Sequence, residues 1–221
     1  KEKKKKKKDD EEADTIPPAP HMELRMLSGS SQDLHKGLTL SAGSPVVRFD
    51  TAAIHLEIQV DTLWYRIVPP KFSRPEPLRP MVFTAPYKWE EGTKYRLTID
   101  SAAVNDIYGL DNAQLVHEFT TKKSEDYSAI SFNVSGLDGR KGIVEVLSSS
   151  DKPVASAPVN GDLATIRYLS PGTYYARLFI DANDDGEWTT GSITDSIQPE
   201  EVYYYPKKIN LKKNWTIEQS W

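Results

Sequence analysis

The stretch KYRLTID, residues 94–100, alternates polar and apolar side chains without a break. Successive side chains of a β-strand point to opposite faces, so we expect Tyr95, Leu97 and Ile99 to face a core. The polar side chains between them then face water. A strand with one buried and one wet face is typical of an antiparallel sheet.

Short runs of the same kind recur on both sides of this stretch, with Gly, Pro, Asn and Asp between them. They lie at 46–49, 54–58, 63–68, 81–83, 131–135, 142–147, 164–168 and 174–180. Five prolines at 69–80 mark a loop or a sheet edge, because proline cannot donate to a ladder. Residues 110–117 offer at most a turn or two of helix. The pattern predicts an all-β chain built of two β-sandwich domains.

The expected domains are 21–123 and 124–221, divided at the polar hinge of residues 122–126. Residues 1–20 are predicted to be a disordered charged linker, because KEKKKKKKDDEEAD contains nothing that can bury surface and PPAP follows it. The lysine run could also be a nucleic-acid or membrane arm. The acidic run that comes next would repel the same phosphates, which favours the linker.

The composition of the chain excludes several kinds of function and site. The chain has 28 Lys and Arg against 32 Asp and Glu, so there is no global field to hold nucleic acid. There is no cysteine and no apolar run of about 18 residues, which excludes disulfides, thiolate sites and a membrane-spanning helix. The sequence opens with Lys and has no apolar signal region, so we expect any secretion signal or lipid-anchor cysteine upstream.

The loop DANDDGE at 181–187 suggests calcium. Asp181, Asn183 and Asp185 place oxygen atoms at positions one, three and five, and Gly follows at position six, as in the front half of a calcium loop. The closing position twelve is Ser192 rather than a bidentate Glu, although Asp195 could substitute. We therefore predict weak calcium binding at most and no other cofactor. The alternative is a solvated β-turn after a buried strand.

The residues argue against catalysis. The four histidines are widely spaced, and the sequence has no nucleophile elbow, phosphate-binding glycine loop or dinucleotide fingerprint. The pairs Glu90-Glu91 and Glu200-Glu201 could serve a hydrolase only if two acids faced each other across a cleft. We expect no catalytic and no cofactor-binding residues.

Aromatic side chains are numerous for two small sandwiches. Exposed rings can stack on sugars or contact a protein partner, and Trp64 and Tyr204 are the candidate ligand aromatics. In the run 203–205 alternate tyrosines point opposite ways, so at least one should face solvent. Core packing and a domain interface are the alternative explanation for the aromatic residues.

Several stretches resemble known families. GTKYRLTI at 92–99, VNDIYG at 104–109 and HEFTT at 117–121 resemble the C-terminal half of the bacterial Ig-like domain of the surface-layer-protein type. LSPGTYY at 169–175 resembles prealbumin-like or carboxypeptidase-regulatory-like sandwich domains. The segments 179–191, 198–200 and 214–218 resemble the C-terminal part of Ig-like-domain proteins of the Bacteroidetes cell envelope, in which an Asp commonly stands near the position of Thr189.

The resemblance implies the C-terminal fragment of an exported lipoprotein of the cell envelope, in the periplasm or on the outer surface. The expected function is a non-catalytic structural or adhesive module whose partner is a protein or glycan of the envelope. The alternative is a carbohydrate-binding accessory module that uses exposed aromatics.

Overall fold

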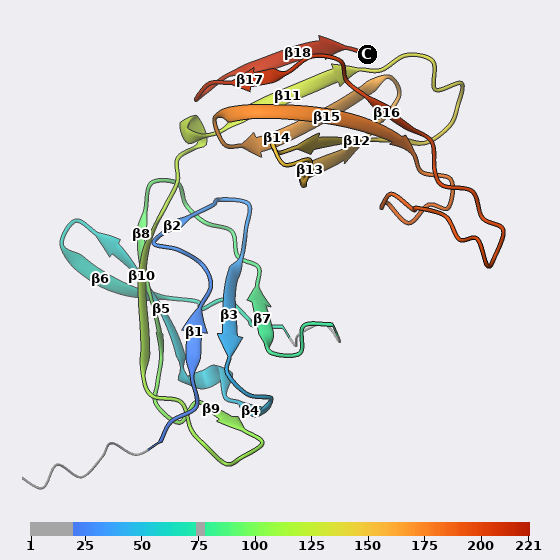
Figure 1. The fold of residues 1–221 in the computed structure, drawn as a ribbon. Coiled ribbons are helices and arrows are strands. Elements are labelled where there is room, and N and C mark those ends of the chain that lie inside the picture. Colours follow the sequence, from blue (N-terminus) through green and yellow to red (C-terminus); the bar gives the residue numbers. More distant parts are fainter. Residues whose placement is uncertain (1–19, 74–77) are drawn as a thin grey trace, which may run out of the picture.

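The computed structural model describes residues 20–73 and 78–221, which form strands apart from two short 3-10 turns and the connecting loops (Figure 1). The predicted all-β class is confirmed. The disorder expected for residues 1 to about 20 falls, except for Pro20, outside the described residues. Pro75 and Pro77 of the proline-rich segment also lie outside them.

The first sandwich contains two sheets and a ribbon. The three-stranded sheet has the order β1-β3-β7, with strands Leu24–Met26, Leu38–Ala42 and Val82–Ala85. The five-stranded sheet has the order β2-β10-β8-β5-β6, with strands Ser31–Gln32, Leu115–Thr121, Lys94–Ile99, Ile54–Val60 and Leu63–Ile67. The ribbon pairs β4 (Val46–Phe49) with β9 (Val104–Asp106), and the turn η1 (Thr51–Ala53) leads into β5.

The central strand β8 supplies the middle of the first core. Tyr95, Leu97 and Ile99 are at most 1% exposed, which confirms the register predicted from the alternation. They belong to one buried cluster with Leu38 and Leu40 of β3 in the opposite sheet. Burying side chains of this size contributes about 1.5 to 3 kcal/mol each, so β8 holds the two sheets together.

The second sandwich has a three-stranded and a larger sheet. The first has the order β14-β11-β18, with strands Leu163–Leu169, Ser128–Asn133 and Thr216–Ser220. The other has the order β13-β12-β15-β16, with strands Pro153–Pro158, Gly142–Leu147, Gly172–Ile180 and Val202–Tyr204. A short strand β17 (Ile209–Leu211) pairs with the beginning of β15.

The second core is separate from the first. Phe132 of β11 and Leu178 of β15 lie in it, and Tyr205 and Trp221 pack on Phe132 with ring centroids 5.6 and 5.5 Å away. No residue belongs to both buried clusters. Each sandwich therefore contains its own hydrophobic core.

The turns of helix allowed for residues 110–117 are absent. Asn112 is fully buried, and its Oδ1 accepts from the Val104 amide at 2.7 Å while its Nδ2 donates to the Asp100 carbonyl at 2.9 Å. These bonds fix an extended backbone, and β10 begins at Leu115. The Asn112 backbone amide also donates to the Val104 carbonyl, so Asn112 is bonded to Val104 in both directions.

The two sandwiches follow one another through the turn η2 (Ser124–Asp126), and the second lies across one end of the first (Figure 1). The domain ranges given above stay a prediction, although η2 lies between the two cores. In the part of the chain that the structure describes, no helix is long and apolar enough to cross a membrane.

Candidate functional site

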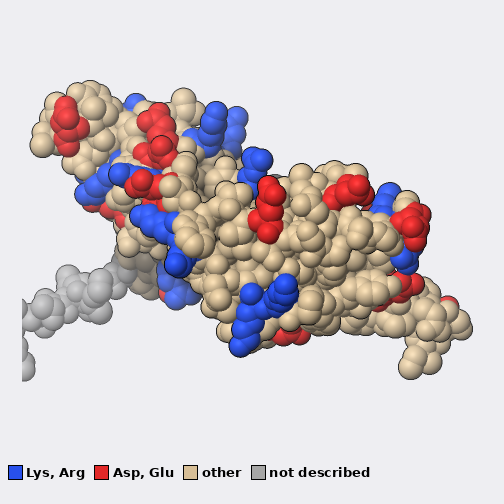
Figure 2. Space-filling view, turned by 90° about the horizontal axis from the view of Figure 1, so that it is seen from above, with Lys and Arg blue, Asp and Glu red and all other residues tan. Residues whose placement is uncertain are grey.

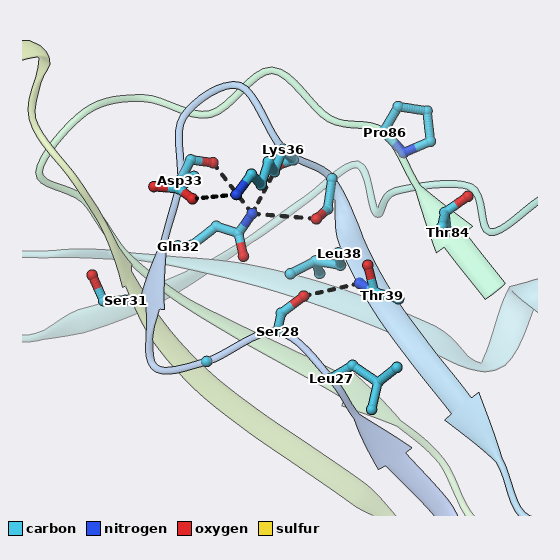
Figure 3. A pocket seen from close by; sticks show the side chains of 12 residues that line it. Leu27, Ser28, Ser31, Gln32, Asp33, Lys36, Leu38, Thr39, Thr84 and Pro86 are labelled. Carbon is cyan, nitrogen blue, oxygen red and sulfur yellow. Dashed lines mark hydrogen bonds and ion pairs between the residues drawn. The ribbon is translucent and has the colours of Figure 1, made fainter. Parts of the chain in front are cut away.

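A groove of about 600 Å³ opens where the chain crosses between the sheets of the first sandwich, from β2 to β3 (Figure 3). Buried Leu38 lies among its lining residues, together with the hydroxyls of Ser28 and Thr39. The Ser28 Oγ accepts from the Thr39 amide at 2.9 Å. Gln32 donates its side-chain amide to the Lys36 carbonyl at 2.7 Å. These polar groups are therefore bonded within the fold.

Asp33 provides the only acidic side chain in the lining of this groove. Its carboxylate lies 3.0 Å from Lys36 Nζ and 2.7 Å from Lys122 Nζ. Burial alone would raise the pKa of Asp33, but the two lysines outweigh it and lower that pKa to about 2. Asp33 therefore stays ionised near neutral pH and cannot act there as a general acid.

The predicted calcium residues lie together in one loop after β15. The Asn183 side-chain amide donates to Asp185 Oδ2 at 2.8 Å, and the Gly186 backbone amide donates to Asp181 Oδ2 at 3.2 Å. Asn183 Oδ1 accepts from the Asp185 amide at 3.1 Å. The other carboxylate oxygen of Asp181, Oδ1, is buried and has no hydrogen-bond partner. The loop thus uses most of these oxygens to hold its own backbone.

Within residues 20–73 and 78–221, no three His, Cys, Asp or Glu side chains come close enough together to hold a metal ion. Asp195, the residue that could have replaced Ser192, accepts from the Ser192 hydroxyl at 2.7 Å within its own turn. Calcium at Asp181, Asn183 and Asp185 stays a prediction.

Glu200 closes the same loop, a role that differs from the hydrolase pair considered for it in the sequence. Its Oε1 accepts from the Ala182 amide at 2.8 Å and its Oε2 from the Thr189 amide at 3.0 Å. The Trp188 indole also donates to the Glu200 carbonyl, at 3.2 Å. The two ends of the loop are thereby joined across a separation of 18 residues, which no local pattern reveals.

Trp64 lies on the outer face of the five-stranded sheet, where the positively charged side chains of Arg96 and Lys94 lie over its ring. The Arg96 guanidinium stands 4.2 Å and the Lys94 ammonium 5.4 Å from the ring centroid. Arg96 also bonds Glu57 at 2.8 Å, which fixes the guanidinium against the indole. One ring face is therefore engaged in a cation–π contact rather than free for a sugar.

Tyr204 lies on the outer face of the second sandwich, 56% exposed. It stands opposite Arg177 on β15, and its hydroxyl is 3.4 Å from Asp151 beyond the end of β12. Arg177 bonds Glu145 at 2.5 Å and lies 5.3 Å from the centroid of the half-buried Trp188 ring. We call Trp188, Arg177 and Tyr204 the outer row. Trp64 belongs to the other sandwich and is not part of it.

Two of the tyrosines at 203–205 face solvent and one faces the core. Tyr203 is 45% and Tyr204 56% exposed, whereas Tyr205 is only 8% exposed. This confirms that at least one ring of the run is exposed. Alternation accounts for Tyr204 outside and Tyr205 inside. Tyr203 stands opposite buried Leu178 but stays exposed because β16 is the edge strand of its sheet.

The histidines do not form a cluster. His55 pairs with Asp100 at 2.8 Å, His117 stacks on Phe119 at 5.4 Å between centroids, and His35 stacks on Tyr168 in the second sandwich at 4.9 Å. Burial lowers the pKa of the His117 imidazole, whose Nε2 has no hydrogen-bond partner.

Three of the four adjacent acids considered for a hydrolase pair make other contacts through their side chains. Glu91 Oε2 accepts from the Ser124 amide at 2.7 Å, and Glu201 pairs with Arg140 at 2.9 Å and Tyr203 Oη at 2.7 Å. Glu200 closes the loop after β15. The structure thus gives Glu91, Glu200 and Glu201 roles in holding the fold.

No protein-family model matches the chain, and no curated protein matches it. Among solved structures, the domains MG0-NIE-MG1 of α2-macroglobulin from Escherichia coli are 10% identical, with a TM-score of 0.38, over 84% of this chain and 70% of that one. The N-terminal part of the bacterial S-layer protein SbsC is 13% identical, with a TM-score of 0.36, over 73% of this chain and 41% of that one.

A third solved structure, BcpA, the major pilin subunit of Bacillus cereus, is 5% identical, with a TM-score of 0.29, over 90% of this chain and 68% of that one. All three TM-scores lie below 0.5. These likenesses therefore place the chain in no family and assign it no activity.

Proposed function

We propose that the chain is a non-catalytic structural or adhesive module of a bacterial cell-envelope protein. A segment outside the given sequence would carry the export signal and the lipid anchor. Its partner would be a protein or a glycan of the envelope. The resemblance of residues 92–121 and 169–175 to Ig-like and prealbumin-like domains motivates this proposal.

The observation that carries the proposal is the tandem arrangement of two sandwiches with separate cores. A module that displays a surface at a distance from its anchor needs folded units in series, each stable by itself, and a defined connection between them. The two sandwiches follow one another along the chain, and each has its own hydrophobic core, which supports the proposal.

The surface charge supports the same proposal. Basic and acidic side chains are interspersed on the face shown in Figure 2, with wide areas that carry neither. The ion pairs Lys94–Glu118 at 2.8 Å and Arg140–Glu201 at 2.9 Å illustrate the same mixing. Such a surface favours solubility beside other envelope proteins over attraction to a polyanion.

Cell fractionation followed by surface proteolysis tests the location. We expect an antibody against residues 128–221 to detect the full-length protein in the envelope fraction of the organism that encodes it. Treatment of intact cells with protease, with and without permeabilisation of the outer membrane, distinguishes the outer surface from the periplasm. Recovery of the protein in the cytoplasmic fraction would contradict the proposal.

The second candidate function is carbohydrate binding, and the outer row favours it. Tyr204 pairs with Arg177 across the sheet and the Trp188 ring lies 5.3 Å from the Arg177 guanidinium, whose charge is balanced by Glu145. Flat rings beside fixed hydrogen-bonding groups are the chemistry that recognises sugar rings. Trp64 is the less favourable aromatic because two cations, Arg96 and Lys94, stand over its ring, whereas Arg177 alone stands over Trp188 and at a longer distance than Arg96 from Trp64.

A glycan array with the wild-type chain and three variants tests this function. Tyr204→Ala and Trp188→Ala should each abolish a specific signal, whereas Trp64→Ala should leave it intact. Tyr108→Ala, at a tyrosine 74% exposed on the first sandwich, is the matched control. The absence of binding to any glycan would leave only the structural or adhesive proposal.

A further inference from the structure

Tyr168 has a backbone conformation that a large side chain rarely adopts. Its φ is 60°, in the left-handed region, although it lies inside the strand β14. The pairing of β14 with β11 shifts there, so that Arg167 and Tyr168 together stand opposite Ala129. This is a β-bulge, and bulges redirect side chains. Strain of this kind persists only where neighbouring structure enforces it.

The bulge directs Tyr168 toward the first sandwich. Its ring stacks on the imidazole of His35 with centroids 4.9 Å apart and an interplanar angle of 18°. The Tyr127 ring stands edge-on to Tyr168 at 5.4 Å and to His35 at 5.9 Å. Three rings, two from one sandwich and one from the other, thus contact each other.

Tyr127 adds directional bonds to these ring contacts. Its hydroxyl accepts from the Leu34 backbone amide at 2.8 Å and donates to Asp33 Oδ1 at 3.2 Å. Burial raises the pKa of Tyr127 to about 12, so the hydroxyl keeps its proton. Lys122 lies 5.6 Å from the Tyr127 ring centroid and pairs with Asp33 at 2.7 Å.

The turn η2 is bonded on both sides as well. The Ser124 amide donates to Glu91 of the first sandwich at 2.7 Å. Asp126 pairs with Lys213 of the second sandwich at 2.7 Å. The connection is therefore not a free linker. We call the following residues the joint: Asp33, Leu34, His35, Lys122, Tyr127 and Tyr168.

We infer that the joint fixes one angle between the two sandwiches, so that they move as a single rigid unit. The bulge at Tyr168 is the part of the second sandwich shaped for this contact. The loop 33–37 is its counterpart in the first, held there by Gln32 and by the Trp89 indole, which donates to the Lys36 carbonyl at 2.9 Å. This inference is independent of whether the chain binds a glycan or lies in the envelope.

The distance between two spin labels, one on each sandwich, tests the inference. The chain has no native cysteine, so Val47→Cys on β4 and Val154→Cys on β13, at positions 70% and 51% exposed, label it uniquely. Double electron–electron resonance on this labelled chain should give one narrow distance distribution. A broad distribution in the otherwise unchanged chain would overturn the inference.

Variants on each side of the joint test whether the contact between Tyr168 and His35 fixes the angle between the sandwiches. Tyr168→Gly keeps the left-handed backbone without strain and removes only the ring, and His35→Ala removes the stacking partner without touching the bulge. Each should broaden the distribution at least twofold, and the double variant should broaden it little further because both remove the same contact. Tyr108→Ala replaces an exposed tyrosine that is not part of the joint. It should leave the width of the distance distribution unchanged.

Amide NMR spectra of the variants guard against misfolding. Resonances of β8 and of β15 should stay dispersed at their wild-type positions, with shifts confined to residues near the joint. If both variants keep these spectra and neither broadens the distance distribution, the joint does not fix the angle.

Discussion

At the scale of the residue, alternation along β8 decides which side chains enter the first core. Tyr95, Leu97 and Ile99 are buried as their spacing predicts, because a strand in a one-sided sheet has no other way to hide apolar side chains. The contacts of residues whose partners are distant in sequence cannot be predicted from alternation. Glu200 and Trp188 have roles that depend on how a long loop returns to the sheet.

Leu97 allows a direct test of the first core. It is fully buried at the centre of β8, so Leu97→Ala should reduce the free energy of unfolding of the first sandwich by about 2 to 5 kcal/mol. Chemical denaturation followed by fluorescence of the tryptophans measures this loss. Thr98→Ala on the opposite face is the control, and a loss below about 0.5 kcal/mol for Leu97→Ala would mean that its side chain is not in the core.

At the scale of the element, the loop after β15 decides between two explanations of its acidic residues. The sequence predicts weak calcium binding through Asp181, Asn183 and Asp185. The structure shows most of their oxygens bonded to the loop itself and Glu200 closing it. Sequence could predict the turn, since Asn, Asp and Gly favour it, but not the closure by Glu200.

Calcium titration followed by amide NMR distinguishes weak calcium binding from a purely structural role of the acidic residues. Weak binding predicts shifts confined to residues 181–195, with a dissociation constant of about 10⁻⁴ to 10⁻³ M, and Asp181→Ala should abolish them. If the protein shows no shifts at millimolar calcium, the acidic residues serve the turn alone.

Hydrogen exchange tests whether Glu200 holds the loop after β15 closed. Glu200→Ala removes both acceptors of the Ala182 and Thr189 amides, so amide hydrogen exchange across 182–199 should accelerate. Glu187→Ala, at an exposed acid of the same loop, is the matched control. Equal exchange in the two variants would show that Glu200 does not hold the loop.

At the scale of the whole molecule, the sequence predicted two sandwiches but not how they meet. The polar hinge at 122–126 marks the division between the domains, but its sequence does not show how they are connected in space. In the structure it is bonded to both sides, and the strained Tyr168 lies in a stretch that reads as an ordinary strand. The bulge shifts the alternation by one residue, so that Leu169 and not Tyr168 follows Ile166 into the core. The sequence does not show this shift, because Tyr168 and Leu169 could each fill a core position.

The joint should weaken in acid. The pKa of Asp33 is about 2 in the folded chain against an ordinary value of 3.8, so its contribution is complete above about pH 4 and is lost as the pH falls toward 2. After allowance for solvent screening the loss should be about 1 kcal/mol. Unfolding free energies between pH 5 and 2 should fall more steeply for wild type than for Asp33→Asn. Parallel curves would contradict this role of Asp33.

Hydrogen exchange in the Leu97→Ala variant tests most directly the claim that the chain is two sandwiches with separate cores. Mass spectrometry of wild type and variant, compared peptide by peptide, should show faster exchange in β3, β5, β8 and β10. Exchange in β12 and β15 of the second sandwich should keep its wild-type rate, because no core residue is shared. Equal acceleration in β12 and β15 would show that the chain has one cooperative core, and would contradict the account.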